Sequence, residues 1–108
     1  MAWFPCPHLH GDVELTEERE RHIAAQHPEL LPEHCDCIGH TLADPDEVRS
    51  DSDYPHTRLF FRWYDDLRGG KYVVIAVVSG PPPDTRSWIV TAFLAGRPPK
   101  GELEWKRP

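Results

Sequence analysis

The sequence contains no hydrophobic run long enough to cross a membrane. Nowhere in the 108-residue chain is there a stretch near the roughly 18 to 20 consecutive apolar residues that a membrane-spanning helix requires. The N-terminal sequence, Met-Ala-Trp-Phe-Pro-Cys-Pro, also lacks the basic and apolar regions of a secretory signal peptide. We therefore predict a cytoplasmic protein with no membrane partner.

Cysteine and the common catalytic motifs are scarce. The three cysteines, Cys6, Cys35 and Cys37, cannot all pair within one chain, and the last two are too close for an ordinary disulfide, which favours a reducing compartment. The sequence has no glycine-rich phosphate loop, GxSxG nucleophile or HExxH zinc motif. Their absence argues against nucleotide-driven chemistry, serine hydrolysis and zincin proteolysis.

Positive charge is nearly missing from the first half of the chain. Residues 1–57 hold three Arg and no Lys against 13 acidic residues, whereas residues 58–108 hold nine basic and five acidic ones. The net charge of -6 speaks against a nucleic-acid partner, but a basic half is compatible with phosphate binding. Chance differences between the halves of a small domain explain the asymmetry equally well.

Two helices are predicted in the first half. Thr16 is a typical N-cap residue, and Pro28 pushes the preceding residue out of helical geometry, so the first helix ends near Gln26. A second helix follows, because apolar residues recur there at spacings of four, three and four. Those residues are Leu31, Cys35, Ile38 and Leu42.

The second half has the pattern of β-strands. Strands are expected over residues 58–64, 72–79 and 87–95, separated by turn signals, in an antiparallel meander. The apolar run 73–78 predicts a central strand buried on both faces. A Pro-rich tail, 97–108, contains Glu-Leu-Glu-Trp and could add one edge strand.

The fold predicted from these elements belongs to the α+β class. We expect a single domain over residues 1–108, with its core over about 13–95. Two N-terminal helices would pack on a twisted antiparallel sheet of about four strands, leaving the other face open for a ligand.

His22 and His27 are the first candidates for acid–base chemistry, because imidazole exchanges protons near neutral pH. On a continuous helix the two would lie about 140° apart. A break at Pro28 would instead place His27 at the helix C-terminus, where the dipole favours a positive charge. A histidine that merely ends the helix is the alternative.

Two arginines and a threonine on the predicted strands are further candidates. Arg58 and Arg62 share a strand face with Phe60 and Tyr64, a combination that suits a phosphate and a stacked base as well as an ordinary solvent face. Thr91 lies in an otherwise apolar strand, either as a placed hydroxyl donor or as a tolerated β-former.

A zinc site is an open alternative, since the chain has several cysteine and histidine residues outside the pair above. None falls in a paired C-x2-C arrangement, and Cys35 belongs to the apolar stripe of the second helix, so no metal and no cofactor are predicted. His34 and Cys37 are nevertheless close on a helix. A zinc-stabilised interaction domain therefore remains a third hypothesis.

The order of short motifs resembles a known nuclease group. The motifs are Leu15-Thr16, Glu18-Arg19, His22-Ile23, His27-Pro28-Glu29-Leu30, Thr41-Leu42, Pro45-Asp46-Glu47-Val48, Arg58-Leu59-Phe60-Phe61-Arg62, Tyr72-Val73-Val74 and Ile89-Val90-Thr91-Ala92-Phe93. Over roughly residues 13–95 this order is similar to the phage and prophage branch of the barnase/EndoU/colicin/RelE-like superfamily. Its members are small metal-independent ribonuclease domains of toxins and mobile elements.

The resemblance implies helices followed by a four-stranded antiparallel sheet, with the site between the first helix and the sheet. By position, His22 and His27 match the helix histidines of the family, Arg58 or Arg62 its strand arginine, and Thr91 its late-strand hydroxyl. Two residues depart from the family pattern: Gln26 stands where a basic residue is frequent, and Phe93 where Tyr is usual.

The leading hypothesis is a metal-independent endoribonuclease in which the ribose 2′-hydroxyl attacks the adjacent phosphate. His22 would act as base, His27 as acid, Arg58 or Arg62 as charge clamp and Thr91 as positioning donor. RNA is the expected substrate, and a cognate protein inhibitor is a further candidate partner. The alternative is a non-catalytic module that binds RNA or protein on the same fold.

Overall fold

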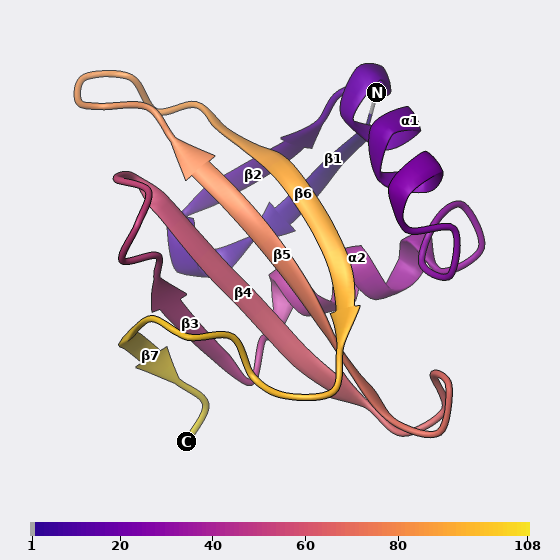
Figure 1. Cartoon of the computed structure of the whole chain (residues 1–108). Helices are drawn as coiled ribbons and strands as arrows, with labels where there is room; N and C mark the ends of the chain where they lie inside the picture. The colour runs from indigo at the N-terminus through magenta and orange to yellow at the C-terminus, as the bar shows by residue number, and fades with distance from the viewer. Residues whose placement is uncertain (1) are drawn as a thin grey trace.

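The fold consists of one large sheet and two helices, seen in a computed structural model that describes residues 2–108 (Figure 1). In chain order the elements are β1 (Ala2–Cys6), the 3-10 helix η1 (Pro7–Leu9), β2 (Gly11–Leu15), α1 (Glu17–Gln26), α2 (Cys35–Ala43), β3 (Glu47–Ser50), β4 (Thr57–Tyr64), β5 (Lys71–Ser79), β6 (Ser87–Ala95) and β7 (Glu102–Lys106). The strands form a single sheet in the order β1-β2-β6-β5-β4-β3-β7. All neighbouring pairs are antiparallel except β2 and β6, which are parallel.

The prediction of two N-terminal helices on about four antiparallel strands is wrong. The sheet in residues 2–108 has seven strands and is mixed, and the hairpin β1–β2 precedes both helices. β1 contains Pro5, which argues against a strand in sequence terms. A proline is tolerated in this place because β1 lies at the edge of the sheet, where its missing N–H breaks no ladder.

The central meander is the part of the sheet that strand periodicity predicts most accurately. β4, β5 and β6 are consecutive antiparallel neighbours, and of the run 73–78 predicted to be buried on both faces, Val73–Val77 are buried and Val78 is partly exposed. The strand expected in the tail is present as β7, which pairs with β3. A bulge in β6 lies opposite Ala76 and Val77, where Thr91 and Ile89 are paired and Val90 is the extra residue.

The two helices begin differently from one another. α1 starts after Thr16, whose hydroxyl accepts the Arg19 N–H at 3.2 Å, and it ends at Gln26 as expected. α2 starts only at Cys35, whereas the apolar spacing placed its start near Leu31. Pro32 explains the difference, because the residue before a proline avoids helical geometry.

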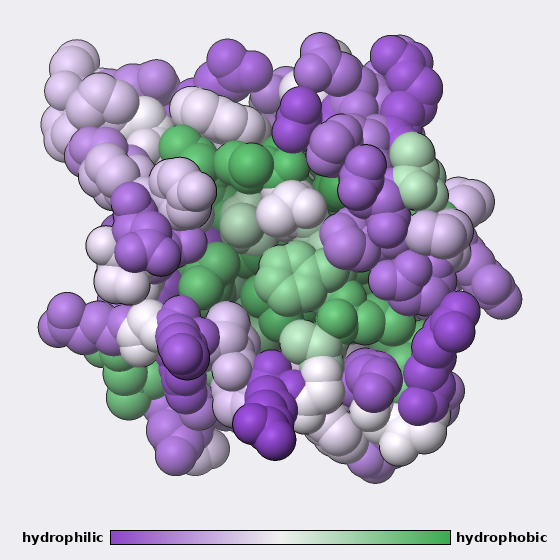
Figure 2. Space-filling model, in the orientation of Figure 1, coloured by the Kyte–Doolittle hydropathy of each residue, from purple (hydrophilic) through white to green (hydrophobic). Residues whose placement is uncertain are grey.

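The core lies between the sheet and α2. Ile38 and Leu42 of α2 are fully buried against the sheet residues Phe60 and Ile75. α1 lies along β6 and contributes Ile23. The opposite face of β4, β5 and β6 has no helix over it, and Figure 2 shows apolar side chains gathered there within a polar rim.

Candidate active site

Thr91 lies on the helix-free face of the sheet. It pairs with Ala76, which pairs in turn with Leu59, so the three side chains form one row across β6, β5 and β4. They line a groove of about 500 Å³, here called the open-face groove. Its other lining residues are Asp51, Ser52, Asp53, Tyr54, Thr57, Val78, Val90, Phe93, Pro99 and Lys100.

Arg58 and Arg62 lie on the opposite face from Thr91. Successive residues of a strand point to opposite sides of the sheet. Because Leu59 faces the groove, Arg58, Phe60 and Arg62 face the helix side of the sheet. Phe60 between them is fully buried in the core on that side. The structure therefore does not bring these arginines together with Thr91.

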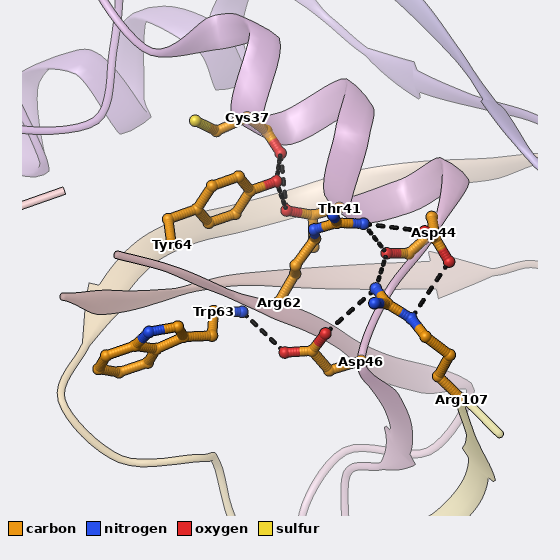
Figure 3. A network of polar contacts seen from close by, with 8 residues as sticks. All are labelled: Cys37, Thr41, Asp44, Asp46, Arg62, Trp63, Tyr64 and Arg107. Carbon is orange, nitrogen blue, oxygen red and sulfur yellow. Dashed lines mark hydrogen bonds and ion pairs between the residues drawn. The ribbon is translucent and has the colours of Figure 1, made fainter. Parts of the chain in front are cut away.

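Arg62 belongs to a polar network at the C-terminal end of α2 (Figure 3). Its Nη1 donates to the backbone oxygen of Asp44 at 2.8 Å and to the Asp44 carboxylate at 3.0 Å. Arg107 pairs with the same carboxylate at 3.3 Å and with Asp46 at 3.1 Å. The network links β4, the segment after α2 and the residue that follows β7. These contacts give Arg62 a structural role.

Tyr64 connects the end of β4 to the first turns of α2. Its hydroxyl donates to the backbone oxygen of Cys37 at 3.1 Å and contacts the Thr41 hydroxyl at 3.0 Å (Figure 3). Burial raises the pKa of the Tyr64 hydroxyl. Tyr64 therefore stays a neutral hydrogen-bonding group that fixes the β4–β5 hairpin against the helix.

Arg58 is held by a carboxylate of β7. Glu104 Oε2 accepts from Arg58 Nε at 2.8 Å and lies 2.6 Å from His8 Nε2. Burial acts to raise the pKa of Glu104, but the hydrogen bonds from His8 and Arg58 outweigh it and lower the pKa below its ordinary value of 4.5. The ionised carboxylate is thus favoured in the folded chain.

Glu104→Gln is expected to lower the free energy of unfolding by about 0.5 to 1 kcal/mol at pH 7, the range of a partly solvated ion pair. A carboxyl group whose pKa falls on folding stabilises the protein above its unfolded pKa and loses that effect as pH falls. The difference from wild type should therefore shrink below pH 4.5. Urea unfolding at pH 7 and near pH 3.5 measures it, with the exposed Glu102→Gln on the same strand as control. A difference that persists in acid would contradict the assignment.

His27 terminates α1 and lies against β6. It is the C-cap residue, and its backbone N–H donates to the oxygen of Ile23 at 2.6 Å. Its Nδ1 is 3.4 Å from the Glu29 carboxylate, and its ring centroid is 6.0 Å from that of Phe93. Phe93 follows Thr91 by two residues and shares its face. His27 and Thr91 therefore flank the same aromatic side chain.

Arg19 is a candidate that the sequence analysis did not select. Its Nη1 donates to the backbone oxygen of Val90 at 3.4 Å, and its Nη2 pairs with Glu18 at 3.3 Å. Val90 directly precedes Thr91, so this guanidinium lies at the edge of β6. The available signal was spacing, because Arg19 precedes His22 by three residues and so shares its side of the helix.

His22 is exposed on α1, one turn after Arg19. We call these residues the α1–β6 cluster: Arg19, His22, His27, Thr91 and Phe93. Contacts with β6 are made by two of these residues, His27 through Phe93 and Arg19 through the Val90 oxygen, whereas the exposed His22 lies on α1. The cluster is suited to proton transfer next to a bound anion, which is the chemistry of phosphodiester cleavage.

A possible metal-binding group lies elsewhere, at the start of α2. One ligand atom each from His34, Asp36 and Cys37 falls within 4.8 Å of the others. Burial raises the pKa of the Cys37 thiol to about 11, and the nearby carboxylates of Asp36 and Asp66 add to the effect.

Comparison with known protein families, with curated proteins and with solved structures found no match for this chain. None of the helices in residues 2–108 is long and apolar enough to span a membrane. Functional assignment therefore depends on the geometry of the α1–β6 cluster and the open-face groove.

Proposed function

We propose that the protein is a metal-independent endoribonuclease whose site is the α1–β6 cluster. One observation carries the proposal: a histidine at the end of α1 and an arginine of the same helix both reach β6 beside Thr91. RNA cleavage by an internal nucleophile needs a base, an acid and a cation; His22 and His27 would supply the first two and Arg19 the third.

In the proposed reaction each residue has one task. One histidine takes the proton of the ribose 2′-hydroxyl as its oxygen attacks phosphorus, and the other gives a proton to the departing 5′-oxygen. The products are a 2′,3′-cyclic phosphate and a 5′-hydroxyl. The Glu29 carboxylate lies 3.4 Å from Nδ1 of His27, so we assign proton transfer to Nε2. Arg19 stabilises the negative charge that develops on the phosphate oxygens.

This assignment differs from the one made on sequence spacing in its choice of arginine. Arg58 and Arg62 pair with Glu104 and Asp44 on the helix-side face, and a guanidinium engaged in this way would have to give up its carboxylate to bind phosphate. The ion pair of Arg19 with Glu18 is longer, at 3.3 Å against 2.8 and 3.0 Å for the other two, and the Glu18 side chain is 78% exposed. We therefore assign the charge clamp to Arg19.

The second candidate function is a non-catalytic RNA-binding module on the same surface. The open-face groove favours it, because Tyr54 and Phe93 offer rings for base stacking and Lys100 offers a charge at its rim. Phe93 also carries no hydroxyl that could give a proton. This module would bind RNA without changing it.

The test is incubation of the purified chain with a mixed RNA pool in buffer containing a chelator, with circular dichroism to verify that the protein stays folded. We expect fragments that end in 2′,3′-cyclic phosphate. Salt-sensitive binding without fragments would support the non-catalytic module instead. Neither cleavage nor binding by the folded protein would overturn both candidates.

A further inference from the structure

The beginning of α2 gathers three different metal-ligating side chains. His34 is the N-cap residue, Asp36 is in the first turn, and Cys37 is 6% exposed. One nitrogen, one carboxylate oxygen and one sulfur from these residues lie within 4.8 Å of one another. In a tetrahedral zinc site with bond lengths of about 2.0 to 2.3 Å, ligand atoms are about 3 to 4 Å apart.

We propose that His34, Asp36 and Cys37 bind a zinc ion. A donor set of imidazole, thiolate and carboxylate suits zinc, whereas magnesium and calcium prefer oxygen ligands alone. Three protein ligands leave one position of the tetrahedron for water or a fourth side chain. The site shares no residue with the α1–β6 cluster, and RNA cleavage does not pass through it.

The electrostatic surroundings favour a cation at this place. The ionisable groups that act on the Cys37 thiol are two carboxylates, Asp36 on the same helix turn and Asp66 in the β4–β5 turn. These two carboxylates place negative charge beside the thiol, which a divalent ion would neutralise. The N-terminal end of a helix alone would favour an anion, so the acidic neighbours decide the sign.

A second element keeps the β4–β5 turn close to the proposed ligands. Tyr64, two residues before Asp66, donates its hydroxyl to the backbone oxygen of Cys37 (Figure 3). A metal ion at the side chain of Cys37 would thus lie where the helix and the hairpin already meet. Its binding is expected to stabilise the folded chain without altering its architecture.

The test uses the full chain, purified free of metal, titrated with cobalt(II) as a coloured substitute for zinc. We expect about one cobalt per chain, with a thiolate-to-metal charge-transfer band that zinc abolishes by displacement. Saturating zinc should raise the Tm by at least about 4 °C, the shift expected for roughly 1 kcal/mol in a domain of this size.

Three variants decide which residues bind the ion. Cys37→Ser should remove the charge-transfer band, and His34→Gln should weaken cobalt binding by at least about tenfold. Cys35→Ser is the matched control, because it changes a cysteine of the same helix turn that lies outside the ligand group, and it should keep the band. The absence of a band in wild type, its persistence in Cys37→Ser, or its loss in Cys35→Ser would overturn the proposal. Because His34 is less buried than Cys37, the His34→Gln variant still tests the site if Cys37→Ser does not fold.

Discussion

Replacement of His27 by alanine is expected to lower the rate of RNA cleavage by about 10² to 10⁴-fold, the range that a positioned acid or base contributes. The imidazole is placed by its helix-ending backbone, by Glu29 at 3.4 Å and by the ring of Phe93. Alanine keeps the backbone and removes the proton carrier. The measurement is the initial rate of cleavage of a defined RNA under conditions of excess substrate.

His40→Ala is the matched control for this variant. His40 is an exposed histidine of α2, outside the α1–β6 cluster, so its loss should leave the rate within about twofold of wild type. Equal losses in both variants, or no loss in His27→Ala, would remove His27 from the mechanism. Circular dichroism of each variant separates a catalytic effect from a folding defect.

Replacement of Arg19 by alanine is expected to lower the cleavage rate by about 10² to 10³-fold, as for a group that stabilises charge only in the transition state. Arg19 is one-third exposed, so the free energy of unfolding should change little. Arg19→Lys keeps the charge but loses the planar fork, and an intermediate rate is expected from it. The same initial-rate assay applies.

Arg62→Ala separates this assignment from the one based on strand spacing. Because Arg62 binds the backbone oxygen and the carboxylate of Asp44, its removal should lower stability by about 1 to 2 kcal/mol and leave kcat nearly unchanged. A large fall in kcat for Arg62→Ala with wild-type activity in Arg19→Ala would reverse the assignment. Urea unfolding gives the stability of both variants.

Local signals were sufficient for the first helix and the meander. Thr16 and Pro28 bracket α1 through capping and proline sterics, which act within a few residues. The strand β3 was not predicted because it is short, and the pairing of β7 with it could not be predicted because the two strands lie far apart along the chain. Pro32 indicates a late start for α2. The apolar spacing of Leu31 and Cys35 nevertheless led to the prediction of an earlier start.

The candidate site was also predictable from local sequence only in part. Alternation along β4 correctly placed Arg58 and Arg62 on one face, yet it could not say which face a helix would cover. Thr91 and His27 reach a common strand because of the sheet topology, which no local pattern contains. Arg19 was one turn from a selected histidine, and only its contact with Val90 gives it a role.

The parallel contact between β2 and β6 consists of one residue pair, Glu14 with Trp88, supported by the ion pair of Glu14 with Arg86 at 2.7 Å. Beyond that pair the outer edge of β6 is left without a strand partner, so the oxygen of Val90 is available to Arg19. The hairpin β1–β2 and the meander are thus joined by very few backbone bonds. Val13 and Leu15 of β2 are fully buried in the core, so the hairpin keeps its place in the sheet through side-chain packing more than through backbone hydrogen bonds.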